Sequence, residues 1–487
     1  MQEFTDRALD VATTAGASYA DIRIVRLESQ AIEVKNGVVQ TLSLDGTFGF
    51  GVRVVADGAW GFASCNRLER KEIDRVAALA VEIAKASAIS KKEDIDLGPP
   101  EVHVDRYVTP VEIDPFEVSL EKKIDYLLRT DKEARAVHGV KVSEGSLGFQ
   151  RERKTFASTE GSFIEQTLIE SGLGLTVMAV AEGEMQQRSY PNSFGRHQVK
   201  AGYEFLGAWD LPGNARRLAE EAVALLSAPQ CPRGTKTILL DGPQLGLQIH
   251  ESCGHPIELD RVFGTEAAFA GTSFLTPEKY GSFTYGSDIV NIVSDAVSPG
   301  GLGTYGYDDE GVPGQTTDIV KDGRFVGYLT SRETASQLRR IHPQAPERSN
   351  GAMRADGWNR MPIIRMNNVS LRPGEWTLDD LIADTDDGIY MMTNKSWSID
   401  DRRLNFQFGT ELAYEIKNGK LGRMLKNATY TGMTPQFWAG CDAICNQDHW
   451  HIWGTANCGK GQPGQVAHTG HGAAPARFRD VQVGVLD

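Results

Sequence analysis

The chain has 487 residues, more than one ordinary core can hold, so we expect two or three domains. Its 51 basic and 65 acidic side chains give a formal net charge of −14, which argues against a nucleic-acid surface. No stretch approaches the roughly 20 apolar residues of a membrane span, and the N-terminal segment lacks the cationic start of a secretory signal. The six scattered cysteines favour a reducing compartment, so we expect a cytoplasmic protein with no membrane partner.

Residues 1–90 follow a helix–sheet–helix pattern. Apolar residues at helical spacing predict a helix over 4–15. Alternating polar and apolar residues then predict four short antiparallel strands, with turns at KNG and DG. The segment RKEIDRVAALAVEIAKAS is an amphipathic helix that closes the unit. A proline-rich, acidic connection follows it.

The same order of elements recurs over about 115–230. A G-x-G pattern at Gly49–Gly51 in the first half has a counterpart at Gly172–Gly174 in the second. Two strands that each need a close backbone approach would also explain the pattern, but we favour a duplicated α/β unit. The sequence therefore predicts an N-terminal α/β domain over 1–230 and a second domain over 231–487.

The second domain is expected to be rich in strands. Asp322-Gly323 and Asn418-Gly419 lie where hairpin turns are expected. The glycine-dense segment Pro299–Gly314 lacks the Gly-Lys-Ser/Thr ending of a phosphate loop, so we expect a mobile loop over a site. The predicted fold class is α+β. It combines an N-terminal duplicated α/β region, whose antiparallel sheets are flanked by helices, with a C-terminal β-rich catalytic domain that carries a metal-binding helix.

That helix contains His250, Glu251 and His255 within six residues. Two imidazoles can bind a divalent metal, and a carboxylate beside them can act as a general base. In a regular α-helix, five residues separate the two rings by roughly 140°, which is too far for both to reach one ion. The glycine and proline that flank His255 favour either a π-helical turn, which returns the second ring, or a helix that ends before Pro256.

Two histidines do not complete a catalytic zinc site, which normally has three protein ligands and a water molecule. Spacing alone does not choose the third ligand among the candidates Glu258, Asp260, His342, His449, His451, Cys458, His468 and His471. A donor for a developing oxyanion is equally open, and the candidates are backbone amides, Tyr430, His449 and His451.

Four groups of motifs resemble the TldD branch of the TldD/TldE (PmbA) family of metallopeptidases. They are HESCGHP at 250–256, DDEG at 308–311, SNG and RMNN within 349–368, and NCGKGQ at 457–462. The resemblance implies that His250, His255 and Cys458 bind Zn²⁺ and that Glu251 is catalytic. The TldE branch lacks the H-E-x-x-x-H motif, so this chain is similar to the active type. The resemblance also implies a dimer, with itself or with a TldE-like chain, around a cavity that admits unfolded peptides.

The sequence therefore predicts a zinc-dependent peptidase that removes leader segments or degrades unfolded and short peptides, with Glu251 as the general base. Two alternatives stay open. A non-hydrolytic peptide-binding or assembly subunit would hold a structural metal with a fourth protein ligand, such as Cys253 or His451. A redox sensor would instead use the late cysteines Cys441, Cys445 and Cys458.

Overall fold

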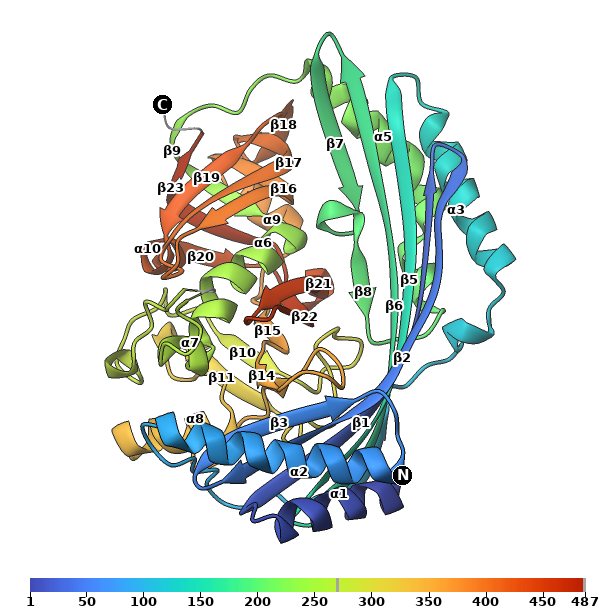
Figure 1. Ribbon diagram of the computed structural model, residues 1–487. Coiled ribbons are helices and arrows are strands. Elements are labelled where there is room, and N and C mark those ends of the chain that lie inside the picture. Colours follow the sequence, from blue (N-terminus) through green and yellow to red (C-terminus); the bar gives the residue numbers. More distant parts are fainter. Residues whose placement is uncertain (269–270, 485–487) are drawn as a thin grey trace.

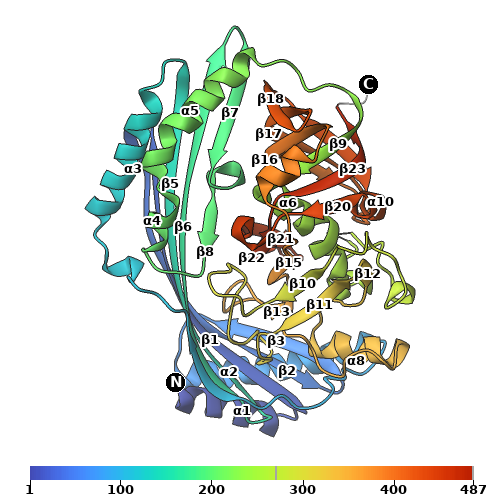
Figure 2. The same ribbon diagram turned by 180° about the vertical axis from the view of Figure 1, so that it is seen from behind.

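The computed structural model describes residues 1–268 and 271–484. An eight-stranded sheet with flanking helices occupies the N-terminal part, and two further large sheets with short helices form the rest. Figure 1 shows the long N-terminal strands bending around the C-terminal part, and Figure 2 shows the same arrangement from behind. The chain is thus a mixed α+β protein with several antiparallel sheets. Within the described ranges, no helix has both the length and the apolar character needed to cross a bilayer.

The N-terminal helices are α1 (Gln2–Thr14), α2 (Arg70–Ser87), α3 (Leu120–Arg135), α4 (Phe205–Trp209) and α5 (Leu211–Ser227), with short turns η1 (Ala88–Ser90), η2 (Pro115–Glu117) and η3 (Ser193–Gly195). The strands are β1 (Tyr19–Lys35), β2 (Val38–Ala56), β3 (Ala59–Cys65), β4 (Val104–Val108), β5 (Val140–Ser158), β6 (Phe163–Ala181), β7 (Glu184–Tyr190) and β8 (His197–Val199). They pair in the order β3-β2-β1-β5-β6-β4, and β7 and β8 also pair with β6.

The prediction of four short strands in the first 65 residues was wrong. β1 and β2 form one long hairpin, which turns at Asn36-Gly37 as expected. The DG turn is present at Asp57-Gly58, between β2 and β3. The expected division of the second strand near residue 45 does not occur, because Asp45 and Gly46 stay in the ladder opposite Ser29 and Glu28. A glycine inside a strand can continue the ladder when its backbone remains extended, so two predicted strands merge into β2.

Strands from both predicted halves share one sheet, because β1 pairs with β5. α1 and α2 pack on one part of this sheet, and α3 and α5 pack on the other (Figure 1). The two G-x-G patterns have local causes. A Cβ on Gly51 would lie 2.5 Å from the carbonyl oxygen of Trp358, and one on Gly174 would lie 1.5 Å from that of Gly195. Close approach therefore accounts for both patterns, while duplication of the halves and the boundary at residue 230 stay predictions.

The C-terminal helices and turns are α6 (Gly242–Ile249), η4 (His250–Gly254), η5 (His255–Ile257), α7 (Leu259–Val262), η6 (Pro277–Lys279), α8 (Arg332–Ile341), α9 (Leu378–Ala383), α10 (Thr434–Ala439) and η7 (Gln447–His449). The strands are β9 (Gly234–Leu240), β10 (Ile292–Asp295), β11 (Thr316–Lys321), β12 (Arg324–Phe325), β13 (Met353–Arg354), β14 (Ile363–Ile364), β15 (Asn368–Leu371), β16 (Asp387–Ile399), β17 (Asn405–Lys417), β18 (Lys420–Leu425), β19 (Thr429–Met433), β20 (Cys441–Ile444), β21 (His451–Lys460), β22 (Gln465–Ala473) and β23 (Ala476–Val483).

Two large sheets enclose the predicted metal-binding helix. One has the order β16-β9-β23-β19-β17-β18, and an extra pairing of β16 with β17 closes part of it into a ring. The other has the order β12-β11-β10-β15-β22-β21. The hairpins predicted at Asp322-Gly323 and Asn418-Gly419 are confirmed, since they join β11 to β12 and β17 to β18. α6 contacts β16 from one sheet and β22 from the other, so it lies between them.

The segment Pro299–Gly314 was predicted to be a mobile loop over a site, but most of it is buried, so it is not a surface loop. Its acidic residues pair with cations of the N-terminal sheet. Asp309 Oδ1 lies 2.7 Å from Lys154 Nζ, and Glu310 Oε1 lies 3.1 Å from Arg53 Nη1. All four side chains are almost completely buried, so the segment fixes the C-terminal part against the N-terminal sheet.

Candidate metal centre

The start of α6 is fixed by Asp241, which follows strand β9. The Asp241 Oδ1 atom accepts a hydrogen bond from Gln244 N at 2.8 Å, and its Oδ2 atom accepts one from Thr393 N at 3.0 Å. Burial raises the pKa of the Asp241 carboxyl to about 7, and these two hydrogen bonds oppose the rise. An aspartate cap followed by Pro243 is a strong helix-start signal. It fixes the first residue of α6 and therefore the position of the histidines that follow the helix.

At His250 the α-helix changes into the π-helical turn η4. A π-helical turn is one of the two geometries that the spacing of the histidines predicts. This prediction is confirmed. A Cβ on Gly254 would lie 2.1 Å from Met366 Sδ, so a larger residue in the turn would have to displace this buried side chain. The wider turn brings both imidazoles to one side, with ring centroids of His250 and His255 4.8 Å apart and ring planes at 86°. The two histidines are therefore placed to share one ligand.

Cys458 on β21 completes the cluster. One donor atom from each of His250, His255 and Cys458 lies within 4.8 Å of the others, and all three residues are buried. The Sγ atom of Cys458 is 3.7 Å from Nε2 of His255. Tetrahedral zinc with bonds of about 2.1 Å to nitrogen and 2.3 Å to sulfur would separate these atoms by about 3.6 Å. The donor types and their spacing therefore fit such an ion.

The hydrogen bonds of His250 leave its Nε2 atom free for a metal. Val369 O can only accept, so His471 Nδ1, 3.0 Å away, carries a proton. Burial lowers the pKa of His471 well below its usual value, so the ring is neutral and its Nε2 accepts. His250 Nδ1, 2.7 Å from that nitrogen, must then donate. The metal-facing nitrogen of His250 consequently carries the lone pair.

His255 is oriented by a carboxylate. Its Nδ1 lies 3.1 Å from Glu258 Oε2. Burial opposes ionisation of Glu258, but Lys460, His255 and Arg261 outweigh it and hold the pKa of Glu258 well below its usual value. The ionised carboxylate accepts from His255 Nδ1–H, which leaves Nε2 as the lone-pair donor. This carboxylate–histidine pair is a common support of metal ligands.

Cys458 is placed to act as a thiolate. Burial raises the pKa of its thiol, but His255 and Arg365 outweigh that effect and bring the pKa below the ordinary value of 9.0. Arg365 Nη2 donates to Cys458 Sγ at 3.0 Å. A thiolate is the form of cysteine that binds metals. Glu258, His471 and Arg365 thus support the cluster in roles that sequence spacing did not reveal.

The cluster opens into a pocket of about 490 Å³. Glu251 lines it, as does Arg403 from the connection between β16 and β17. Arg403 Nη1 lies 2.6 Å from Glu251 Oε2. The three side chains considered as oxyanion donors do not line this pocket; Tyr430, for example, binds Gln244 and Gln248 in the core. Arg403 was missed because no sequence motif marks it.

The remaining third-ligand candidates are engaged elsewhere. Asp260 pairs with Lys460 at 2.7 Å, and His342 Nε2 lies 2.7 Å from Pro277 O. His449 Nε2 accepts from Leu378 N at 3.2 Å.

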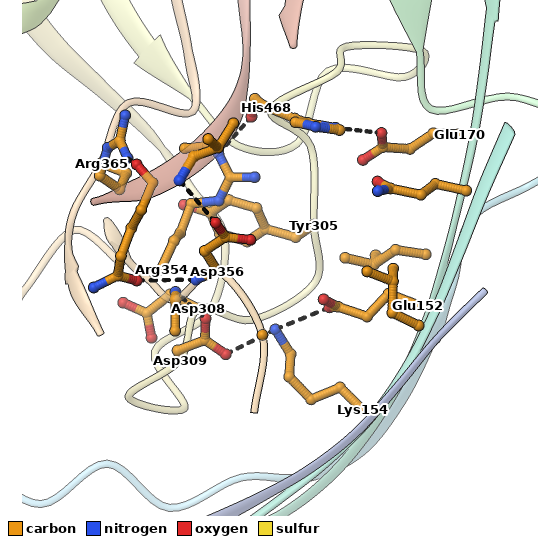
Figure 3. Close-up of a pocket in the computed structure, with 18 of the residues that line it drawn as sticks. Glu152, Lys154, Glu170, Tyr305, Asp308, Asp309, Arg354, Asp356, Arg365 and His468 are labelled. Carbon is orange, nitrogen blue, oxygen red and sulfur yellow. Dashed lines mark hydrogen bonds and ion pairs between the residues drawn. The ribbon is translucent and has the colours of Figure 1, made fainter. Parts of the chain in front are cut away.

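A second, polar pocket lies between the N-terminal sheet and the C-terminal part (Figure 3). Facing side chains pair across it. Lys154 lies 2.7 Å from Asp309, and His468 Nδ1 lies 2.6 Å from Glu170 Oε2. Lys154 also lies 3.3 Å from Glu152, which belongs to the same strand. This mutual pairing makes the pocket a seam between the two parts, distinct from the metal centre.

The structure also bears on the two alternatives. Cys253 packs in the hydrophobic core, and His451 packs against Trp209 and Trp453. Within residues 1–268 and 271–484, neither joins the three-residue cluster, so the fourth ligand of a structural site is not found. Cys441 and Cys445 are free thiols. Burial raises the pKa of both, which makes them poor redox centres.

Comparison with known proteins agrees with these features. Three domain models match the chain: PmbA/TldA metallopeptidase domain 1 over residues 20–84, the central domain over 113–227 and the C-terminal domain over 233–485.

Among its relatives, a metalloprotease of Methanocaldococcus jannaschii is 31% identical over 94% of this chain and 95% of its own length. A zinc metalloprotease TldD homolog of Saccharolobus solfataricus is 23% identical, with 87% and 88% covered. The crystal structure of TldE from Thermococcus kodakarensis, 15% identical, superposes over 99% of both chains with a TM-score of 0.75, which shows a shared fold. The chain belongs to the PmbA/TldD metallopeptidase family.

Proposed function

We propose that this chain is a zinc-dependent peptidase that cleaves unfolded or short peptides, in leader-peptide removal or in peptide degradation. The observation that carries the proposal is the convergence of His250, His255 and Cys458 beside Glu251 in one pocket. Three protein ligands are typical of catalytic zinc, whereas structural zinc usually has four. When bound, zinc would supply a Lewis acid and lower the pKa of a water molecule.

Glu251 is the general base in this proposal. Its Oε2 atom accepts from Arg403 Nη1, which fixes the carboxylate, and no described residue donates to its Oε1 atom. Oε1 takes a proton from the attacking water and then passes it to the nitrogen of the departing amine. His471 and Glu258 hold the two imidazoles in the tautomers that leave Nε2 free.

Extended peptides are the proposed substrates because an edge strand borders the pocket. β21 is the last strand of its sheet, and its residues Thr455–Gly459 line the pocket. The preceding Gly454 is already hydrogen-bonded, through its N–H to His197 and through its carbonyl to Asn192. An edge strand can pair with the main chain of a peptide with little regard for its side chains. We further propose that the chain works as a dimer, with itself or with a TldE-like chain, around an enclosed cavity. Its six free thiols suit a reducing cytoplasm.

The test combines metal analysis with two variants. Protein purified without added zinc should carry one zinc ion per chain, and Cys458→Ser should lose most of it. Glu251→Gln should keep the zinc and lose about 10²–10⁴-fold in cleavage of an unstructured peptide, as expected for a missing general base. Undiminished cleavage by Glu251→Gln would remove Glu251 from the mechanism. Wild-type protein that holds no zinc would refute the metal centre.

A further inference from the structure

Arg403 occupies a backbone position built to present its side chain. Its φ of 63° lies in the left-handed region, which is unfavourable for a residue other than glycine. The Arg403 N–H donates to Asp400 O at 2.8 Å, and its carbonyl accepts from Thr434 Oγ1 at 3.0 Å. The Asp400 carboxylate also accepts from Leu404 N at 2.8 Å. These contacts hold the turn on both sides of Arg403, so the guanidinium enters the pocket from a fixed point.

The guanidinium uses only part of its hydrogen-bonding capacity. An arginine that serves only to pair a carboxylate commonly binds it with two parallel N–H donors. Arg403 instead binds Glu251 through Nη1, while its Nε is buried without an acceptor. Nη2 has no acceptor among residues 1–268 and 271–484. A buried donor without an acceptor is unfavourable. The Arg403 side chain is 17% exposed, and it lines the pocket. Because Nη1 is used by Glu251 and Nε is buried, Nη2 is the donor that remains available to a molecule that enters the pocket.

We propose that Arg403 binds the oxygen of the scissile carbonyl as that oxygen gains negative charge. The inference rests on the proposed peptidase function and names its missing oxyanion donor. A cysteine thiolate donates more charge to a metal than a neutral ligand does. An ion held by Cys458 would therefore polarise a carbonyl less, and a second cation would have more to contribute. Arg403 supplies that cation beside Glu251, in a partly enclosed pocket where charge-assisted hydrogen bonds are strong.

The first test compares Arg403→Ala and Arg403→Lys with Arg402→Ala, which removes the same charge from the exposed neighbouring residue. On an unstructured peptide with an amidated C-terminus, Arg403→Ala should lower kcat about 10²–10³-fold and change KM by less than about threefold. Arg403→Lys should recover part of kcat, and Arg402→Ala should match the wild type. Zinc content and the thermal unfolding transition should be unchanged in all three variants, which separates the effect from misfolding.

The second test does not depend on turnover. A peptide with a phosphinate in place of the scissile amide mimics the charged, tetrahedral state. Calorimetric titration should show that Arg403→Ala binds it about 10²-fold or more weakly than the wild type, while binding of the parent peptide to zinc-depleted protein is unchanged. Equal binding of the phosphinate by Arg403→Ala and by the wild type would overturn the proposal. A loss of cleavage that is confined to peptides with a free C-terminus would also overturn it, because Arg403 would then bind the terminal carboxylate of the substrate.

The two proposals fail in distinguishable ways. Wild-type protein that cleaves no peptide would contradict the peptidase function, and the phosphinate titration would still decide the role of Arg403. Cleavage that depends on Glu251 but not on Arg403 would contradict only the present inference.

Discussion

Replacement of His471 by asparagine should weaken zinc binding about 10–100-fold. The His471 ring is fully buried and links His250 Nδ1, at 2.7 Å, to Val369 O, at 3.0 Å. Asparagine is too short to span both contacts, so His250 loses its acceptor and its fixed orientation. A buried donor left without its acceptor costs about 1–3 kcal/mol. This range covers the roughly 1.4–2.7 kcal/mol that a 10–100-fold change in affinity represents.

The measurement is a competition titration of zinc against a chelator of known affinity, near neutral pH. His468→Asn is the matched control, because His468 lies on the same strand but pairs with Glu170 across the seam. Its zinc affinity should equal that of the wild type. If His471→Asn kept wild-type affinity with an unchanged unfolding transition, His471 would not orient a metal ligand, and the tautomer assignment of His250 would be wrong.

Three further predictions concern the metal, the packing and the pH dependence. Chelation should abolish peptide cleavage, and added zinc should restore it. The circular dichroism spectrum should stay unchanged, because one large hydrophobic core joins the two sheets around the site; a collapse of the spectrum would contradict this. Gly174→Ala should lower the free energy of unfolding by more than about 2 kcal/mol, because the new Cβ would lie 1.5 Å from a backbone oxygen. Gly207→Ala should not lower it in this way, because no atom lies within 4 Å of a Cβ at that position. Denaturant titration of both variants measures the difference. Burial lowers the pKa of His197 from 6.5 to about 3. Between these two pH values the unfolded state binds more protons than the folded state, so the free energy of unfolding decreases as the pH falls. At about pH 5 the decrease is about 2 kcal/mol. His197→Leu should reduce the acid slope of an unfolding series, and exposed His138→Asn should not.

Local patterns carried the successful predictions. The turns at Asn36-Gly37 and Asn418-Gly419 followed from residue types that accept a positive φ, and both have one in the structure. The π-helical turn followed from the spacing of two histidines around a glycine. Each of these conclusions depends on a few neighbouring residues, whose physical preferences can be evaluated without knowing the fold.

Long-range arrangements could not be predicted in this way. Arg403 lies 152 residues from Glu251, and His471 lies 221 residues from His250. Their meeting depends on how the sheets pack on α6. The prediction for Pro299–Gly314 failed for the same reason. A glycine-rich acidic segment has the composition of a surface loop, and its cationic partners lie in another sheet, far away in the sequence. Resemblance to a family, rather than spacing, selected Cys458.

The position of Cys458 itself depends on an irregularity in β21. Thr455 pairs with Thr469, and an unbroken antiparallel register would then pair Cys458 with the half-exposed Val466. The register shifts between Thr455 and Cys458, so that Cys458 pairs with Ala467 instead. Paired residues face the same side and alternate along a strand, so a shift of one residue moves a side chain to the opposite face. Cys458 thereby joins the face of Thr469 and His471, where His250 also lies. The glycine-rich sequence around this cysteine permits such a bulge, and the bulge is what turns an edge-strand thiol towards the histidines of a distant helix.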